Sequence, residues 1–336
     1  MNEGQIPPPN PADEEDGLIF ACTLDGKGSA ETVDWDYVEK WTPEGPPLWL
    51  HVNGASPRVR EWISAGGGLT EPTAGVMLSP ESRPRVFRGA KGYVAVLRGI
   101  NLNPGSDTED MVSLRMWSDG HRLITVREEK LKSVREVFEF LTVERDGPGT
   151  IPELCLRLAE QLTAKIGAVV LDYDDQLDAI ESEMDDGDSV ELRRRLGDLR
   201  QEIVGVRRHL APQREALNQL MADPPDWLGQ QQVLMLRELT DRSQRHIEEI
   251  DAARERAVVL KDDIANRLSE TMNRNMYVLS IIAGIFLPLS FMTGLLGINV
   301  GGMPGVDSAD AFWITCGIMV ALLGVELYLF RRLGWL

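Results

Sequence analysis

A charge-free run of 23 residues, from Met276 to Ile298, constrains this chain more than any other feature of its sequence. As a helix rising about 1.5 Å per residue it would be about 34 Å long, enough to cross a bilayer hydrocarbon core of about 30 Å. A second apolar run, residues 311–330, contains one charged residue, Glu326. We therefore predict a transmembrane domain over residues 276–336, with spans at 276–298 and 311–330.

The cations that flank these spans predict their orientation. Lys261, Arg267 and Arg274 precede the first span, Arg331 and Arg332 follow the second, and the connection between the spans contains no Lys or Arg. Because positive charge is retained on the cytoplasmic side of a membrane, both termini should face the cytoplasm.

The balance of charge limits the kinds of partner that this chain can bind. The chain has 35 Lys and Arg against 53 Asp and Glu, a formal net charge of −18. Such an excess of acid argues against nucleic acid, whose phosphates require a basic surface, and favours cations. The cysteines, Cys22, Cys155 and Cys316, are too far apart in sequence for a CxxC site.

The residues before the spans predict an α/β cytosolic domain followed by long stalk helices. We expect a disordered acidic N-terminus at 1–16, the α/β domain at 17–147 and a helical stalk at 148–275. Asp119-Gly120 predicts a β-hairpin. The strands that we expect are Leu18–Leu24, Leu48–Val52, Tyr93–Ile100, Val112–Trp117 and Arg122–Arg127, and the long helices are 152–184, 189–222 and one rod over 227–298.

A stripe of polar and small side chains runs along this last helix at alternating steps of four and three residues. We call it the polar stripe; it consists of Asp262, Asn266, Ser269, Asn273, Met276, Ser280, Ala283, Leu287, Ser290, Gly294 and Gly297. A spacing that averages 3.5 residues is typical of the seam of a left-handed bundle. Hydroxyls, amides and small residues would suit the wall of a narrow wet pore, with Met276 and Leu287 as apolar constrictions that gate by dewetting.

The same stripe has a second interpretation, because small residues also gather where helices pack against each other within a bilayer. Asp262 and Asn273 favour the pore, since the polar face continues in register beyond the apolar run, although a solvated helix face tolerates both. The two interpretations remain open on the stripe alone.

The residues after the stripe carry a family resemblance. Gly297-Ile298-Asn299 is followed by Val-Gly-Gly-Met-Pro-Gly at 300–305, between two apolar runs at the C-terminus. This arrangement resembles the CorA family of divalent-cation transporters, whose signature is Gly-Met-Asn after the first of two C-terminal spans. The variant with Ile298 resembles the ZntB zinc-transporter branch.

The resemblance implies a CorA-like homopentameric funnel in a lipid bilayer, with the first span of each subunit lining the axial pore. Asn299 would then present a ring of amide oxygens to the hydrated ion as an outer-sphere ligand, and Gly297 would let the loop turn inward. Ile298 replaces the signature methionine and favours zinc over magnesium. Asp262 falls where many members carry a ring aspartate. Without the flanking Pro-Gly pattern, Asn299 and Gly297 would be ordinary helix C-caps.

Acidic side chains flank the predicted pathway. Asp172, Asp174, Asp175 and Asp178 begin a carboxylate-rich stretch that could attract cations or could simply form a solvated hairpin tip. Asp307 and Asp310 in the outer loop could do the same or keep the loop soluble.

Glu326 is a functional candidate by default, because it is a charged residue inside a span. Its position five residues before Arg331 favours snorkelling to the boundary or a local ion pair over a proton relay.

The sequence thus predicts a bacterial inner-membrane transporter of divalent metal cations, most of all Zn²⁺, that is not an enzyme and needs no cofactor. No P-loop, HExxH or GxSxG motif is present. The alternatives are a CorA-type channel for Mg²⁺, Co²⁺ or Ni²⁺ and a non-conducting, membrane-anchored metal sensor.

Overall fold

The computed structural model describes residues 16–65, 67–81, 83–184, 187–298, 305 and 308–335. The chain divides into two compact units, one up to Lys261 and one from Asp262. The expected boundary between stalk and membrane domain at 275/276 rests on hydropathy and stays a prediction. The expected disordered N-terminus, 1–16, lies outside the described residues apart from Asp16.

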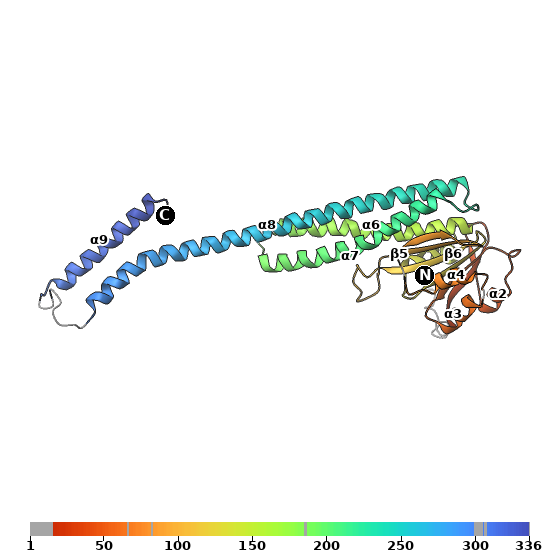
Figure 1. The fold of residues 1–336 in the computed structure, drawn as a ribbon, viewed down its shortest axis with the longest axis horizontal. Helices are drawn as coiled ribbons and strands as arrows, with labels where there is room; N and C mark the ends of the chain where they lie inside the picture. The colour runs from red at the N-terminus through yellow and green to blue at the C-terminus, as the bar shows by residue number, and fades with distance from the viewer. Residues whose placement is uncertain are drawn as a thin grey trace, which may run out of the picture. The chain divides into compact units, whose positions relative to one another are not determined.

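The first unit contains a seven-stranded sheet with the order β2-β1-β3-β7-β6-β5-β4. Its strands β5 and β6 are labelled in Figure 1. Its neighbouring strands pair antiparallel except β3 and β7, which are parallel. The strands are β1 Leu18–Leu24, β2 Ala30–Val33, β3 Leu48–Asn53, β4 Arg85–Arg88, β5 Tyr93–Gly99, β6 Val112–Ser118 and β7 Arg122–Arg127. All the expected strands are therefore present, with bounds that differ by at most one residue.

The predicted hairpin at Asp119-Gly120 joins β6 and β7. Gly120 has φ of +92°, a left-handed conformation that glycine adopts without strain. The carboxylate of Asp119 accepts a hydrogen bond from the backbone N–H of Arg122 at 2.7 Å. The turn thus has its own local determinants, which is why sequence alone located it.

Helices cover both faces of this sheet. On the first face α2 Trp35–Lys40, α3 Pro57–Ser64 and α4 Glu71–Met77 pack on one apolar core. On the second face the core is shared with α5 Lys132–Glu139, which a π-helical turn at Phe140–Glu144 extends, and with the start of α6. Alternate residues of each central strand enter opposite cores, as Trp49 and Leu50 do in β3.

The two strands that the sequence did not reveal are short edge strands. Residues of β2 read Ala-Glu-Thr-Val and those of β4 read Arg-Val-Phe-Arg, so neither gives an apolar run. An edge strand needs only one partner and can stay partly solvated, which weakens the pattern that identifies it.

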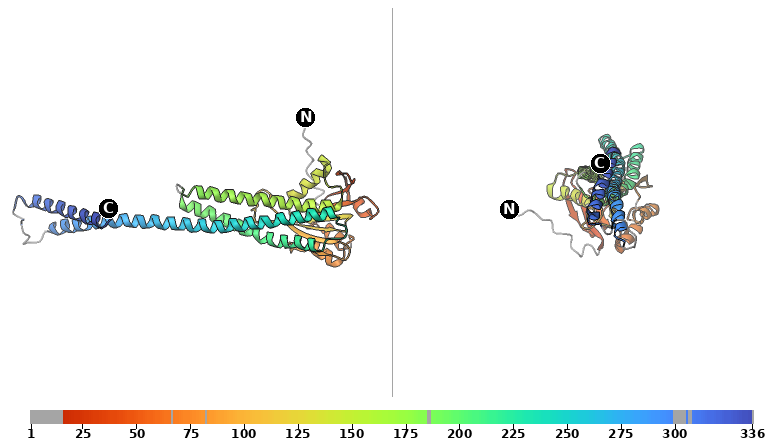
Figure 2. Two further views of the ribbon diagram at one scale, coloured as in Figure 1. Left: turned by 90° about the horizontal axis from the view of Figure 1, so that it is seen from above. Right: turned by 90° about the vertical axis from the view of Figure 1, so that its left-hand side faces the viewer.

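The stalk of the first unit consists of α6 Ile151–Ser182, α7 Ser189–Ala222 and the first half of α8 Gln230–Leu296. These three helices run side by side (Figures 1 and 2). The Thr150 hydroxyl caps α6 by accepting a hydrogen bond from the backbone N–H of Glu153. The predicted helix bounds are correct to within three residues.

The second unit contains the C-terminal part of α8 and the helix α9 Ala311–Arg332. They form an antiparallel pair, as two contacts between them show. The Tyr277 hydroxyl donates to the backbone carbonyl of Trp335 at 2.7 Å, and a Cβ on Gly284 would lie 2.9 Å from the ring of Phe330. The predicted rod is confirmed, because α8 continues without a break from stalk to apolar segment.

Candidate functional site

Two helices of the described residues, α8 and α9, contain segments long and apolar enough to cross a membrane. The most apolar 18-residue windows have mean hydropathies of 2.1 in α8 and 1.9 in α9, and neither window is buried within the chain. Apolar segments that stay exposed in a single chain require lipid or other protein around them.

One face of α8 is covered by α9 and is apolar. The residues of α8 that lose exposure are Ile281, Gly284, Ile285, Pro288, Leu289 and Met292. The matching residues of α9 are Ala311, Thr315, Cys316, Met319, Leu322, Leu323, Glu326 and Phe330. We call these two sets the α8–α9 seam.

The polar stripe lies on a different side of α8. All of its residues, from Asp262 to Gly297, are exposed in the single chain, and none belongs to the seam. At about 100° per residue, the directions of Ser280, Ala283, Leu287, Ser290 and Gly294 average about 150° from those of the seam residues of α8. Within one subunit the stripe is therefore not a packing face for α9.

The polar stripe contains both large, exposed apolar side chains and hydrogen-bonding ones. Met276 is 61% and Leu287 is 69% exposed. The Ser280 hydroxyl donates to the Met276 carbonyl at 2.8 Å, so it retains its lone pairs as acceptors. The stripe thus offers one hydroxyl oxygen, that of Ser280, between two large apolar side chains.

The signature residues follow directly after α8. The backbone N–H of Gly297 donates to the carbonyl of Thr293 at 2.9 Å, which closes the last turn, and Ile298 is exposed. Asn299 lies outside the described residues, as does Asp307. Asp310 is exposed and occupies the N-cap position of α9 without a side-chain capping bond.

The acidic residues of α6 have several different environments. Asp172 accepts a hydrogen bond from the amide of Gln176 at 2.7 Å, and Asp174 and Asp175 form no ion pair within the described part of the chain. Asp178 forms an ion pair with Arg256 of α8 at 2.5 Å. This pair takes Asp178 out of the group available for cations and makes it a link between two stalk helices.

Carboxylates also gather where α6 and α7 face the loop before β6. Desolvation by burial is the largest cause that raises the pKa of Glu202. The nearby carboxylates of Glu109, Asp107 and Asp172 raise it further. Desolvation and the charge of Glu202 likewise raise the pKa of Tyr173, which is buried. Among the described residues, however, no three His, Cys, Asp or Glu side chains are grouped closely enough to hold a metal ion.

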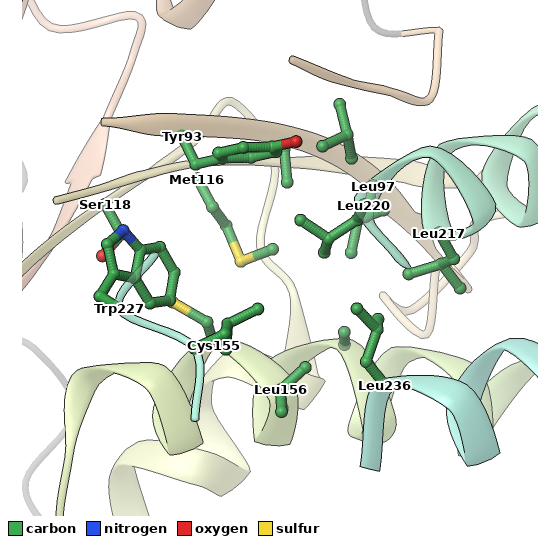
Figure 3. A pocket seen from close by; sticks show the side chains of 14 residues that line it. Tyr93, Leu97, Met116, Ser118, Cys155, Leu156, Leu217, Leu220, Trp227 and Leu236 are labelled. Carbon is green, nitrogen blue, oxygen red and sulfur yellow. The ribbon is translucent and has the colours of Figure 1, made fainter. Parts of the chain in front are cut away.

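An apolar cavity of about 50 Å³ lies between the sheet and the stalk helices (Figure 3). Met116 of β6, Cys155 of α6 and Leu217 of α7 line it, and the indole of Trp227 stands at one end. The connection from α7 to α8 carries Trp227 and is tied to β4 by the Arg88 guanidinium, which bonds both Asp223 and Asp226. Sequence reasoning missed this attachment, because single charges in a loop give no periodic signal.

Glu326 is the second residue whose setting the sequence did not indicate. Its Oε2 is buried and has no hydrogen-bond partner among the described residues, and no ion pair joins it to Arg331 there. The partly buried side chain lies in the α8–α9 seam, and the expected snorkelling to the membrane boundary stays a prediction. Glu326 precedes Phe330 by four residues on α9, and Phe330 contacts Gly284, a contact that only the structure reveals.

Comparison with known proteins assigns this architecture to a family. Residues 45–332 match the family model described as CorA-like Mg²⁺ transporter protein. The divalent cation transporter CmaX of Pseudomonas aeruginosa is 39% identical over 328 residues, which cover 96% of this chain and 98% of that protein. The zinc transport protein ZntB of Pectobacterium carotovorum is 29% identical over 324 residues, 96% of this chain and 97% of that protein.

Solved structures agree with this assignment. The structure of full-length CmaX superimposes with a TM-score of 0.81 and covers 96% of this chain and 99% of that one. The CorA magnesium transporter of Methanocaldococcus jannaschii gives a TM-score of 0.79 at 18% identity, covering 94% and 98%, and shows the fold. The chain therefore belongs to the CorA-like Mg²⁺ transporter family, a family of membrane transporters and not of enzymes.

Proposed function

We propose that this protein conducts divalent cations, with Zn²⁺ as its principal ion, through an axial pore lined by the polar stripe of several α8 helices. The observation that carries the proposal is the position of the stripe on the side of α8 away from α9, with every member exposed. Helices that share an axis would turn this free face inward and keep α9 outside.

The length of the pathway fits a membrane crossing. From Met276 to Gly297 the stripe spans 21 helical steps, about 32 Å. Ser280 and Ser290 offer oxygen acceptors to a hydrated ion along this length, and Met276 and Leu287 would form apolar constrictions. In this proposal the closed state is a dry pore at one or both constrictions.

Ion recognition would take place at the outer end. Asn299 would present neutral amide oxygens that hydrogen-bond the water shell of a divalent ion without holding it tightly. Asp307 and Asp310 would raise the local concentration of cations, and Asp172, Asp174 and Asp175 would do so at the cytosolic side.

The driving force for entry would come from the membrane potential. Two elementary charges moving through 100 mV change free energy by about 4.6 kcal/mol. With both termini in the cytoplasm, as Arg331 and Arg332 after α9 favour, an inward negative potential draws the ion from Asn299 toward Asp262. The location would be the bacterial inner membrane.

Oligomerisation follows from the same geometry. A single stripe cannot enclose water, so the pore requires several copies, and we propose the homopentamer that the family resemblance implies. Native mass spectrometry of the purified chain in detergent tests this stoichiometry, and a monomer or dimer as the sole species would contradict it.

The choice of Zn²⁺ rests on Ile298 in the signature and on ZntB relatives that are 29% identical over nearly the whole chain. The family model is described as a Mg²⁺ transporter, which makes Mg²⁺, and with it Co²⁺ and Ni²⁺, the second candidate. The test is uptake into proteoliposomes loaded with a Zn²⁺- or Mg²⁺-selective dye. Zn²⁺ flux that exceeds Mg²⁺ flux supports the proposal, and Mg²⁺ flux with Zn²⁺ excluded overturns the ion assignment.

A non-conducting metal sensor would give a different result in the same assay. Flux of every divalent ion would equal that of empty liposomes, and Asn299→Ala would change nothing. A pore predicts instead that Asn299→Ala lowers flux while Asp198→Asn, an exposed carboxylate of α7, leaves it unchanged.

A further inference from the structure

We propose that Glu326 is a proton-binding site inside the membrane, where its protonated carboxyl donates a hydrogen bond to the backbone carbonyl of Gly284. The inference requires α8 and α9 to span a membrane, but it does not require the transported ion to be Zn²⁺. It rests on the position of Glu326, on the apolar character of the α8–α9 seam and on a gap in the hydrogen bonding of α8.

The seam places Glu326 against α8. Phe330 contacts Gly284, and Glu326 precedes Phe330 by one helical turn on the same face of α9. The two helices are antiparallel, so a step of four residues from Gly284 toward the end of α8 matches a step of four residues from Phe330 toward the start of α9. Residue 326 is therefore at the level of Pro288. Glu326 therefore faces the segment of α8 that contains Gly284 and Pro288.

Pro288 leaves a backbone acceptor without its normal donor. In an α-helix the N–H of residue 288 would bond the carbonyl of residue 284, but proline has no N–H. A carbonyl left unpaired in hydrocarbon costs several kcal/mol, so helix-breaking prolines in membranes persist where a neighbouring group supplies a donor. Glu326 is an ionisable side chain of α9 that lies in the α8–α9 seam at the level of Pro288.

The carboxyl group can be that donor only when it carries a proton. Its Oε2 is buried and unpartnered among the described residues, which an ionised carboxylate in an apolar seam could sustain only at high cost. The opposing α8 residues, Ile281, Gly284, Ile285, Pro288, Leu289 and Met292, offer no cation. On α9, Cys316 lies in the seam more than two turns away, and Arg331 and Arg332 lie in the last turn. Binding of one H⁺ neutralises the group and creates the O–H that the Gly284 carbonyl lacks.

The first test observes the proton directly. Infrared spectra of the full-length protein in lipid vesicles at neutral pH are compared with those of Glu326→Gln, in which an amide replaces the acid. The difference spectrum should contain a carboxylic-acid C=O band that the variant lacks, whereas Glu270→Gln, an exposed glutamate on α8, should leave that band in place. A carboxylate band in the Glu326→Gln difference, with no acid band, overturns the inference.

The second test measures the pairing with the Gly284 carbonyl. Pro288→Ala restores an N–H and lets α8 satisfy this carbonyl by itself. Glu326→Leu should then lower the melting temperature in detergent more in the parent protein than in the Pro288→Ala background, because only the parent needs the donor. The two decreases should differ by about 2–4 °C. Glu326→Gln, which keeps an N–H donor, should show less than half of this difference. An equal loss in both backgrounds refutes the pairing, even if metal flux is absent from every variant.

Discussion

A carboxylate placed on either side of α8 tests the orientation of the polar stripe. Leu287 lies on the stripe and is 69% exposed, whereas Leu289, two residues further along, lies in the α8–α9 seam. Leu287→Asp and Leu289→Asp make the same chemical change at nearly the same depth in the membrane. They differ only in the direction of the new charge.

The expected difference is large. An aspartate near the centre of a span costs about 2.5–3.5 kcal/mol when it faces an apolar environment. At 1.4 kcal/mol per tenfold, this lowers the fraction of correctly assembled protein by about 60–300-fold for Leu289→Asp. Leu287→Asp should avoid the penalty, because its carboxylate would face pore water, and it should alter gating by removing an apolar constriction.

The assay combines assembly and flux. Detergent-solubilised protein is followed by fluorescence-detected size-exclusion chromatography, and the recovered oligomer is reconstituted for Zn²⁺ uptake. Leu287→Asp should give an oligomer peak similar to that of the parent and an altered uptake rate, with Leu287→Ala as the uncharged control. Leu289→Asp should give little oligomer.

The opposite result would refute the reasoning in a definite way. If Leu287→Asp assembles as poorly as Leu289→Asp, the side of α8 that carries Leu287 faces lipid or a dry interface. The polar stripe would then be a packing face, and the pore would have to be sought elsewhere.

Three further predictions concern single residues. Asn299→Ala should lower divalent-cation uptake by about tenfold, or 1.4 kcal/mol, without loss of oligomer; unchanged uptake would remove Asn299 from the pathway. Desolvation lowers the pKa of His209 from 6.5 to about 4. The unfolded chain therefore binds this proton more readily, and stability present above about pH 6.5 is lost as the pH falls toward 4. His209→Asn should reduce that loss by about 1–2 kcal/mol, measured by melting temperatures at pH 5 and 7. Burial raises the pKa values of Cys22 and Cys155 to about 12, so maleimide should label them about a thousandfold more slowly than a free thiol until the protein is denatured; rapid labelling of the native protein would contradict this.

Much of the fold could be predicted from sequence because its determinants are local or periodic. The apolar segment of α8, the cap of α6 at Thr150 and the turn at Asp119-Gly120 each carry their own signal within a few residues. The edge strand β4 does not, since Arg85–Arg88 becomes a strand through its pairing with β5.

The candidate site could be predicted only in part, for a similar reason. A step of 3.5 residues showed that Ser280, Leu287 and Gly294 share a face, but not what that face meets. The contact of Gly284 with Phe330 identifies the opposite side as the one that packs on α9. The burial of the Glu326 Oε2 depends on the same tertiary contact, which no local pattern in the sequence indicates.

The distribution of glycine and proline along α8 has a mechanical consequence. From Gln230 to Ala283 the helix contains neither residue, whereas Gly284, Pro288 and Gly294 follow within three turns. Helices bend sharply where proline or glycine weakens the backbone ladder, so the compliance of α8 is concentrated beside Leu287. A tilt of the rod would therefore be absorbed at that level. In the proposed pore, bending of the backbone would then change the width of the constriction at Leu287.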